Sequence, residues 1–228
     1  MRSFSVGAAI IALAGLEVLG AVWGAEDKQD DPFNGWTTDF SAEKADLVSS
    51  GRNTHFILEP GFFQILGNEQ EQLTITVLDE TKKVDGVECR VVVEEESKPG
   101  QVVEKSRNYF AISKRTNSVF YFGEDVGGAW LSGEKGAKFG LMMPGTILLK
   151  ARYYQEIAPG VALDRAEIVS MTETVATPAG TFKNCLKTLE STALNPKEQE
   201  YKYYAPGVGL VQEGEWKLIR YGTVKKMK

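Results

Sequence analysis

The middle of the chain alternates apolar and polar positions with a period of two. In "QLTITVLDET" (72–81), Leu73, Ile75 and Val77 fall on one face of an extended segment and threonines fall on the other. This period predicts a β-strand with one buried face. Three further strands are predicted after it, in "CRVVVEEES", "VVEKSRNYFAIS" and "SVFYFGED".

Turn signals separate these segments. Asp85-Gly86 has the chemistry of a tight hairpin turn, and Pro99-Gly100 suits the two central positions of a type II turn. Further on, Pro178-Ala179-Gly180 and Pro206-Gly207 divide residues 166–216 into four more strands. The glycines near residue 207 do not read as a phosphate-binding loop, because a strand rather than a helix follows them.

The two halves of the chain resemble each other. Each half carries a cysteine shortly after a turn, Cys89 in the first and Cys185 in the second. Each also has an aromatic pair followed by alanine, Tyr109-Phe110 and Tyr203-Tyr204. A repeat of this length predicts a duplicated structural unit that buries one face against its copy.

These patterns predict an all-β fold. We expect an antiparallel curved sheet or half-open barrel built from two related halves, with a β-sandwich as the alternative. The expected organisation is a signal peptide in residues 1–24, a polar and partly ordered lead-in in 25–53, a single β-rich domain with internal duplication in 54–222, and a basic tail in 223–228.

The first residues have the pattern of a secretory signal peptide. Arg2 precedes an apolar run from Val6 to Leu16, which small residues and then a charged stretch follow. The run is shorter than the roughly 20 residues that cross a bilayer. We therefore expect cleavage near Gly24 and a secreted protein, periplasmic or extracellular, that is not an integral membrane protein after cleavage. An uncleaved N-terminal anchor is the alternative.

Composition excludes few classes of function. The chain has 228 residues, 43% hydrophobic and 25% charged, with a formal net charge of -5. These values are ordinary for a globular protein, and we expect no binding to nucleic acid.

The two cysteines allow two interpretations. In an exported chain an even number of cysteines suggests a disulfide, here Cys89–Cys185, and two separately buried thiols are the alternative. Because the chain has one histidine and no Cys-x-x-Cys, it makes a poor zinc site, and we expect no cofactor.

No catalytic constellation stands out. His55 is the only histidine, no Gly-x-Ser-x-Gly motif is present, and the acidic run Glu94-Glu95-Glu96 reads as a solvated strand face. We therefore assign no catalytic residue and expect a protein that is not an enzyme. Glu124 and Asp125 offer carboxylates on a glycine-rich loop, but they are weak candidates for calcium and no metal site is assigned.

Large apolar side chains cluster around the middle of the chain. They are core residues or, in the sharper hypothesis, the lining of an apolar pocket inside a curved sheet, with flexible methionines suited to covering apolar cargo. The candidate pocket residues are Phe110, Phe120, Phe122, Trp130, Phe139, Met142 and Met143.

Three motifs carry a resemblance to a known family. They are "GVEC" (86–89), "PAGTFKNC" (178–185) and "YYAPGVGL" (203–210). In their order and spacing they resemble a widespread family of uncharacterised secreted bacterial all-β proteins, over residues 55–215. The resemblance implies an exported all-β protein and attaches no activity or ligand.

Three functions stay open at this point. The leading hypothesis is a non-enzymatic secreted protein that binds or carries an apolar small molecule or lipid. The alternatives are a structural or assembly factor of the cell envelope that contacts other proteins, and a hydrolase with an unrecognised carboxylate site. A fold alone does not choose among them.

Overall fold

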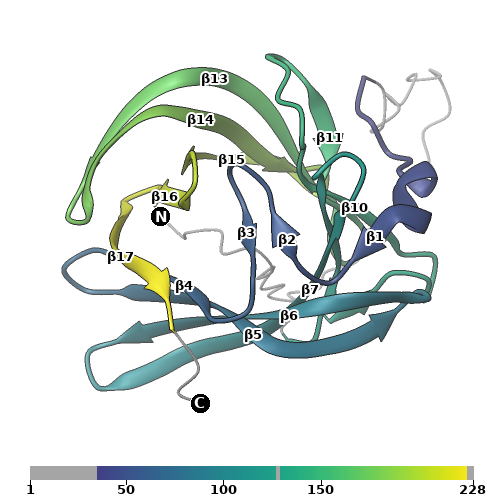
Figure 1. Ribbon diagram of the computed structural model, residues 1–228, viewed down its shortest axis with the longest axis horizontal. Helices are drawn as coiled ribbons and strands as arrows, with labels where there is room; N and C mark the ends of the chain where they lie inside the picture. Colours follow the sequence, from purple (N-terminus) through teal and green to yellow (C-terminus); the bar gives the residue numbers. More distant parts are fainter. Residues whose placement is uncertain (1–34, 127–128, 225–228) are drawn as a thin grey trace, which may run out of the picture.

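The computed structural model describes residues 35–126 and 129–224, and strands dominate both ranges (Figure 1). The elements are η1, a 3-10 helix (Ser41–Asp46), β1 (Leu47–Val48), β2 (Gly51–Arg52), β3 (Ile57–Leu58), β4 (Phe62–Gly67), β5 (Gln72–Val84), β6 (Val87–Lys98), β7 (Gln101–Ser113), β8 (Val119–Glu124), β9 (Trp130–Leu131), β10 (Lys138–Met143), β11 (Arg152–Tyr154), β12 (Glu156–Ile157), β13 (Asp164–Thr177), β14 (Gly180–Thr192), β15 (Asn195–Ala205), β16 (Gly209–Glu213) and β17 (Trp216–Thr223).

Fifteen strands join one hydrogen-bonded antiparallel sheet. Its order is β11-β13-β14-β15-β16-β17-β4-β5-β6-β7-β8-β10-β12, with β1 added to β7 and β9 added to β8. Figure 1 shows that the sheet curves around the small β2–β3 hairpin. The predicted all-β fold with a curved antiparallel sheet is confirmed, and the fifteen strands form one continuous sheet, with the β2–β3 hairpin apart from it, rather than the two sheets of a sandwich.

The long hairpins obey the turn chemistry of the sequence. Asp85 and Gly86 both have positive φ, 47° and 81°, as the predicted tight turn between β5 and β6 requires. Gly100 has φ 84° between β6 and β7, which matches the second central position of a type II turn. Irregular register between Val77 and Thr81 interrupts the β5–β6 ladder, and such bulges bend strands.

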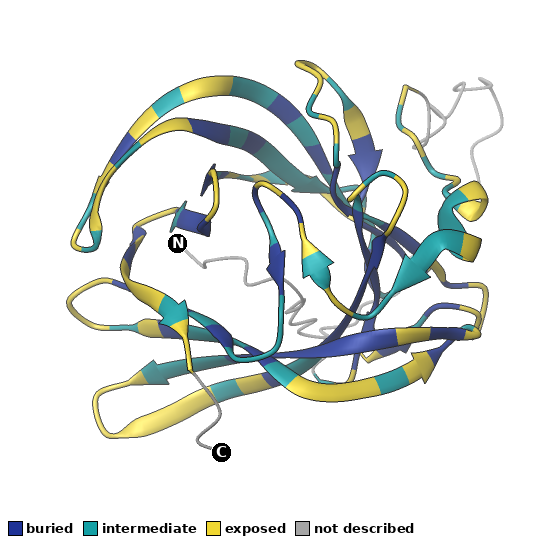
Figure 2. Cartoon of the chain, in the orientation of Figure 1, coloured by how far each residue is buried: buried dark blue, intermediate teal, exposed yellow. Residues whose placement is uncertain are grey.

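The sheet has apolar clusters on both faces. We call the face toward the β2–β3 hairpin the inner face; its cluster includes Leu58, Val92 and Leu186. The outer face of β6, β7 and β8 carries a second cluster, which includes Val91 and which Phe40 and Leu47 partly cover. Figure 2 shows the buried residues along both arms of the sheet. Because both faces of β6 are buried in its middle, that part of the strand carries the apolar run Val91-Val92-Val93 rather than a clean alternation.

The C-terminal strand joins the two halves of the sheet. β17 pairs with β16 on one side and with β4 on the other. Before it lies the meander β13–β14–β15–β16, and beyond β4 lies the meander β5–β6–β7–β8. The internal duplication itself stays a prediction.

The predicted disulfide is wrong. Cys89 and Cys185 are both free, and both have an exposed fraction of 0%. Cys89 lies on β6 in the outer cluster, whereas Cys185 lies on β14 in the inner cluster. Five strands separate β6 from β14 in the sheet order, and a disulfide needs Cα atoms within about 7 Å. The alternative of two separately buried thiols is therefore the correct one.

The described residues cover only part of the predicted N-terminal segments. The predicted signal peptide, residues 1–24, lies outside the described residues. The polar lead-in is described from Gly35 onward, where it forms η1, β1 and β2. A search of the described residues finds no helix with the length and apolar character needed to cross a membrane.

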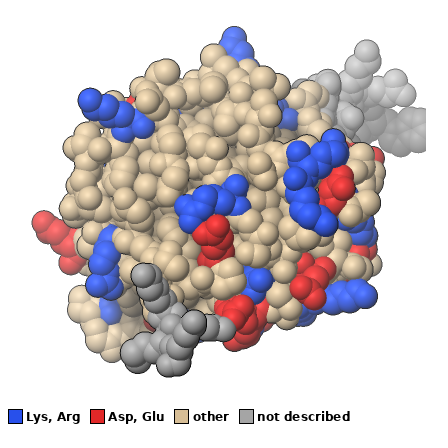
Figure 3. Space-filling model, in the orientation of Figure 1, with Lys and Arg blue, Asp and Glu red and all other residues tan. Residues whose placement is uncertain are grey.

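The charged surface residues form small mixed groups. Arg115, in the turn after β7, pairs with Glu43 and Asp46 of η1. Arg152 of β11 pairs with Glu167 of β13. On the face shown in Figure 3, groups of both signs lie among larger uncharged areas.

Candidate functional site

The inner face of the sheet is hollowed by a cavity that is mostly apolar. The space of about 510 Å³ that is free of protein atoms there includes open solvent at the mouth, so the part enclosed by the protein is much smaller. Residues from β3 to β7, β10, β15 and β16 surround it. We call it the apolar cavity; its lining residues are His55, Phe56, Ile57, Phe62, Gln64, Ile75, Val77, Val92, Glu94, Phe110, Met142, Tyr204, Gly209 and Leu210.

Polar groups in this cavity are few, and two of them have an atom without a hydrogen-bond partner among the described residues. Gln64 Nε2 donates to the carbonyl of Leu210 at 2.7 Å. Neither Nδ1 of His55 nor Oε2 of Glu94 has a hydrogen-bond partner among the described residues. Burial lowers the pKa of His55, so its uncharged form is favoured. The cavity thus presents an apolar wall with two free hydrogen-bonding atoms.

Glu94 lies on the inner face with an exposed fraction of 7%. Its pKa is raised to about 8, first by burial and then by the charge of Glu213, while Lys202 opposes the shift. The carboxyl is therefore mostly protonated at neutral pH, and it is a donor as well as an acceptor. A protonated carboxyl in an apolar wall can orient a polar group of a bound molecule.

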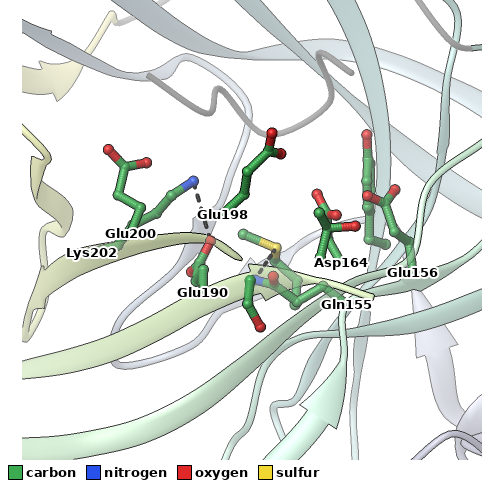
Figure 4. Close-up of a pocket in the computed structure, with 11 residues that line it drawn as sticks. Gln155, Glu156, Asp164, Glu190, Glu198, Glu200 and Lys202 are labelled. Carbon is green, nitrogen blue, oxygen red and sulfur yellow. Dashed lines mark hydrogen bonds and ion pairs between the residues drawn. The ribbon is translucent and has the colours of Figure 1, made fainter. Parts of the chain in front are cut away.

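A second, acidic cavity adjoins the first. It holds about 460 Å³ of space counted in the same way, near the ends of β13, β14 and β15. We call it the acidic cavity; its lining residues are Tyr121, Met142, Gln155, Glu156, Asp164, Glu190, Ser191, Thr192, Glu198, Glu200 and Lys202. Figure 4 shows the side chains of Glu156, Asp164, Glu198 and Glu200 directed to the same side of the strands.

The ammonium group in the lining is already paired. Lys202 is 2% exposed, and its Nζ lies 3.2 Å from Oε2 of Glu190 and 3.0 Å from Oε1 of Glu213. Burial alone lowers the pKa of Lys202, but the charges of Glu190 and Glu213 outweigh it and hold the pKa well above its usual value. Lys202 is therefore a buried cation that connects three neighbouring strands.

Glu156 and Asp164 form an acidic pair in this cavity. Glu156 is 2% exposed and its Oε2 atom has no hydrogen-bond partner among the described residues. Burial first, and then the charges of Asp164 and Glu124, raise the pKa of Glu156 well above its usual range. Burial also raises the pKa of Asp164. Asp164 raises the pKa of Glu156, whereas the hydrogen bond with Glu156 acts in the lowering direction on the pKa of Asp164, so the two carboxyls differ in how strongly they favour a proton.

The two cavities have a common wall. Met142 lines both. Phe110 of the apolar cavity stacks on Tyr121 of the acidic cavity with ring centroids 4.8 Å apart. Tyr204 Oη, from the apolar side, donates to Glu190 Oε1 on the acidic side at 3.1 Å. The cavities are therefore neighbours that share side chains, and Met142 is the unbranched, adaptable member of the wall.

The structure divides the seven candidate pocket residues between two faces. Phe110, Trp130, Met142 and Met143 belong to the inner cluster, and Phe110 and Met142 line the apolar cavity. Phe120, Phe122 and Phe139 belong to the outer cluster, where Phe122 and Phe139 stack with centroids 4.6 Å apart. The cause is the alternation of β8, which turns Phe120 and Phe122 away from the side that Tyr121 faces.

The weak metal candidates have other surroundings. Glu124 is 2% exposed, and burial first, then neighbouring carboxylates, raise its pKa to about 9. Asp125 accepts hydrogen bonds from the backbone N–H of Arg107 at 3.0 Å and from Tyr109 Oη at 2.9 Å. A search of the described residues finds no group of three or more side chains that could hold a metal ion.

Sequence reasoning missed the acidic residues of both cavities. It placed Glu94 on a solvated strand face. It passed over Glu156 and Asp164, because neither belongs to a run of acidic residues that would have drawn attention to it. One signal was available: Glu198, Glu200 and Lys202 recur with a period of two, so charges of both signs share one face of β15.

Comparison with known proteins gives little further information. No family model matches the chain, and no curated protein matches it. One solved structure, a candidate lipoprotein from Parabacteroides distasonis, is similar with 16% identity and a TM-score of 0.38, over 75% of this chain and 100% of that chain. A TM-score of this size is too low to assign a shared fold or function. The resemblance to secreted bacterial proteins therefore stays a prediction.

Proposed function

We propose that the protein is a non-enzymatic binding protein that holds the apolar part of a small molecule or lipid in the apolar cavity. The observation that carries this proposal is the cavity itself, an apolar space on the inner face whose wall includes Phe56, Ile75 and Phe110. Ligand sites are concave, mostly apolar and provided with a few polar groups that orient the ligand. Glu94 and His55 supply those groups.

The affinity of such a site comes from removing apolar surface from water. Each buried methylene contributes about 0.8 kcal/mol, so a tail of about four buried carbons gains about 3 kcal/mol before the entropy of association is subtracted. Most of the lining comes from strands of the large sheet, which hydrogen bonds to their neighbours hold in place, so the shape of that part of the wall is set before a ligand arrives.

The proposal includes a location outside the cytoplasm. Its support is the N-terminal pattern of Arg2, an apolar run and small residues.

Octanol is a suitable first ligand, because it is neutral and has a short apolar tail. We expect titration calorimetry at neutral pH to show saturable binding to the wild-type chain. Ile75→Trp places a large ring in the cavity and should weaken binding by about tenfold or more, which is about 1.4 kcal/mol. Thr74→Trp is the matched control, since Thr74 is the next residue of β5 and faces the other side of the sheet.

Two results would overturn this proposal. One is the absence of saturable binding to a wild-type chain whose circular dichroism shows folded β structure. The other is equal binding by the two tryptophan variants, which would place the bound octanol outside the apolar cavity.

A second candidate function is a hydrolase, and the Glu156–Asp164 pair favours it. Two carboxyl groups of different protonation state are the equipment of many glycosidases. Nitrophenyl glycosides and esters provide the test. A hydrolase would cleave at least one of them, and Glu156→Gln would abolish that cleavage; equal rates with and without Glu156 would eliminate this candidate.

A further inference from the structure

We propose that the acidic cavity binds a protonated amine, so that the ligand of this protein is an amine with an apolar tail. The tail would lie in the apolar cavity, and this inference therefore rests on the proposed function. Four observations support it: the charge of the lining, the free oxygen of Glu156, the shared wall and the burial of the site.

The lining of the acidic cavity is short of positive charge. Among the described residues that line it, five carry carboxyl groups and one carries an ammonium group. That ammonium, on Lys202, already bridges Glu190 and Glu213. Glu156 and Asp164 thus face each other without a cation of their own in the lining. A bound ammonium would supply the missing charge.

Glu156 gives the cavity a specific acceptor. A buried oxygen without a hydrogen-bond donor is destabilising, and its Oε2 atom is in that state among the described residues. Figure 4 shows the Glu156 carboxyl directed to the same side as that of Asp164. An alkylammonium carries three N–H donors, which is enough to reach both carboxyls, and such charge-assisted bonds are stronger than neutral ones.

The shared wall connects head and tail. Met142 lines both cavities, and Gln155 Nε2 lies 3.7 Å from its sulfur. Methionine has three rotatable bonds and adapts to a neighbour more easily than branched or aromatic residues. In the proposed complex a linear ligand lies beside Met142, whose side chain shifts to make room, with its charged end among the carboxyls and its tail against Phe110 and Val92.

The same environment disfavours other head groups. A carboxylate would add a negative charge to a lining that already has more carboxyl groups than cations, and a hydroxyl would offer one donor without charge. Because Glu156 is 2% exposed, water screens these differences weakly. The head group should therefore control affinity strongly.

Four ligands separate the contributions of head and tail. Octylamine, octanol and octanoate share a tail and differ in their head groups, whereas butylamine keeps the head group and shortens the tail. We expect calorimetry at neutral pH to show octylamine binding about tenfold or more tightly than octanol, with octanoate the weakest of the three. Butylamine should bind more weakly than octylamine.

Each departure from this order has its own meaning. If octanol and octylamine bind equally, the amine inference is overturned and the apolar binding function stands. If butylamine binds as tightly as octylamine, the tail contributes nothing and the proposed function falls. If none of the four binds a folded chain, both are overturned.

Variants then locate the head group. Glu156→Gln removes the ionisable carboxyl and keeps the shape, so it should reduce the preference for octylamine over octanol by about fivefold or more. Glu134→Gln is the control, because Glu134 is exposed in the loop after β9 and outside both cavities. A preference that survives in Glu156→Gln would overturn the assignment.

Discussion

Glu94 and Glu95 are neighbours in the sequence and lie on opposite faces of β6. Glu94 lines the apolar cavity, whereas Glu95 pairs with Lys105 on β7 at 3.0 Å near the surface. Burial raises the pKa of Glu94 to about 8 from an ordinary value of 4.5. Position within one strand therefore decides whether a glutamate lines a buried cavity or pairs with a lysine near the surface.

This shift predicts how stability depends on pH. A carboxyl whose pKa is higher in the folded state binds its proton more strongly there. Its contribution to the free energy of unfolding is therefore complete below pH 4.5 and is lost as the pH rises through about 8. Glu94→Gln keeps a neutral side chain at every pH. In the variant, the free energy of unfolding should therefore fall less steeply with pH, by up to about 1.4 kcal/mol per pH unit.

Urea denaturation at several pH values between about 5 and 8 measures this slope. Glu95→Gln is the control, because it makes the same chemical change on the other face of the strand, and its slope should match the wild type. If Glu94→Gln and the wild type lose stability in parallel, Glu94 is not the buried proton-holding group that the structure indicates.

At the scale of elements, one lysine holds three strands together. Lys202 lies on β15, Glu190 on β14 and Glu213 on β16, and the three side chains form a buried ion triad. Lys202 is directly opposite Glu213 in the β15–β16 ladder. Removing one partner of a buried pair leaves an uncompensated charge, which destabilises more than the pair stabilises.

Lys202→Met should therefore lower the free energy of unfolding by about 3–5 kcal/mol. The matched control is Lys105→Met on β7, whose partner Glu95 is near the surface and whose side chain is 58% exposed. That change should cost about 0–1 kcal/mol. Urea denaturation of both variants gives the comparison, and equal losses would mean that the triad is not a dry, buried one.

The long strands could be predicted because their turns are local signals. Asp85-Gly86 specifies a tight turn by its own chemistry, and the alternation of Leu73, Ile75 and Val77 specifies one buried face. The short strands β1, β2 and β9 span two residues each, which is too short to show any period.

The candidate site could not be predicted in the same way. Period two shows which residues of a strand share a face, but it does not show which face is inner when both faces are buried. In β6 the apolar run Val91-Val92-Val93 hides this choice, and so Glu94 was placed in solvent. The disulfide prediction was wrong for the same reason. The face of the sheet on which each cysteine lies follows from the strand order and not from its local sequence.

At the scale of the whole molecule, neither half of the sheet closes a core alone. The inner cluster draws Leu66, Val77 and Phe110 from the first half, and it draws Ile168 and Leu186 from the second. Both cavities also combine residues from the two halves, as Phe110 and Tyr204 do in the apolar cavity. The halves should therefore unfold together, even if they arose by duplication.

β17 is the place to test this cooperativity, because it pairs with both halves. Leu218 is 0% exposed in the inner cluster, and its neighbour Ile219 is 38% exposed. Leu218→Ala should lower the free energy of unfolding by about 2–5 kcal/mol, whereas Ile219→Ala should change it by less than about 1 kcal/mol. Urea transitions followed by circular dichroism and by tryptophan fluorescence should coincide in both variants, since one shared core unfolds as a unit. If the two probes separate in Leu218→Ala, the halves have independent stability, and the two cavities at their junction could open without unfolding either half.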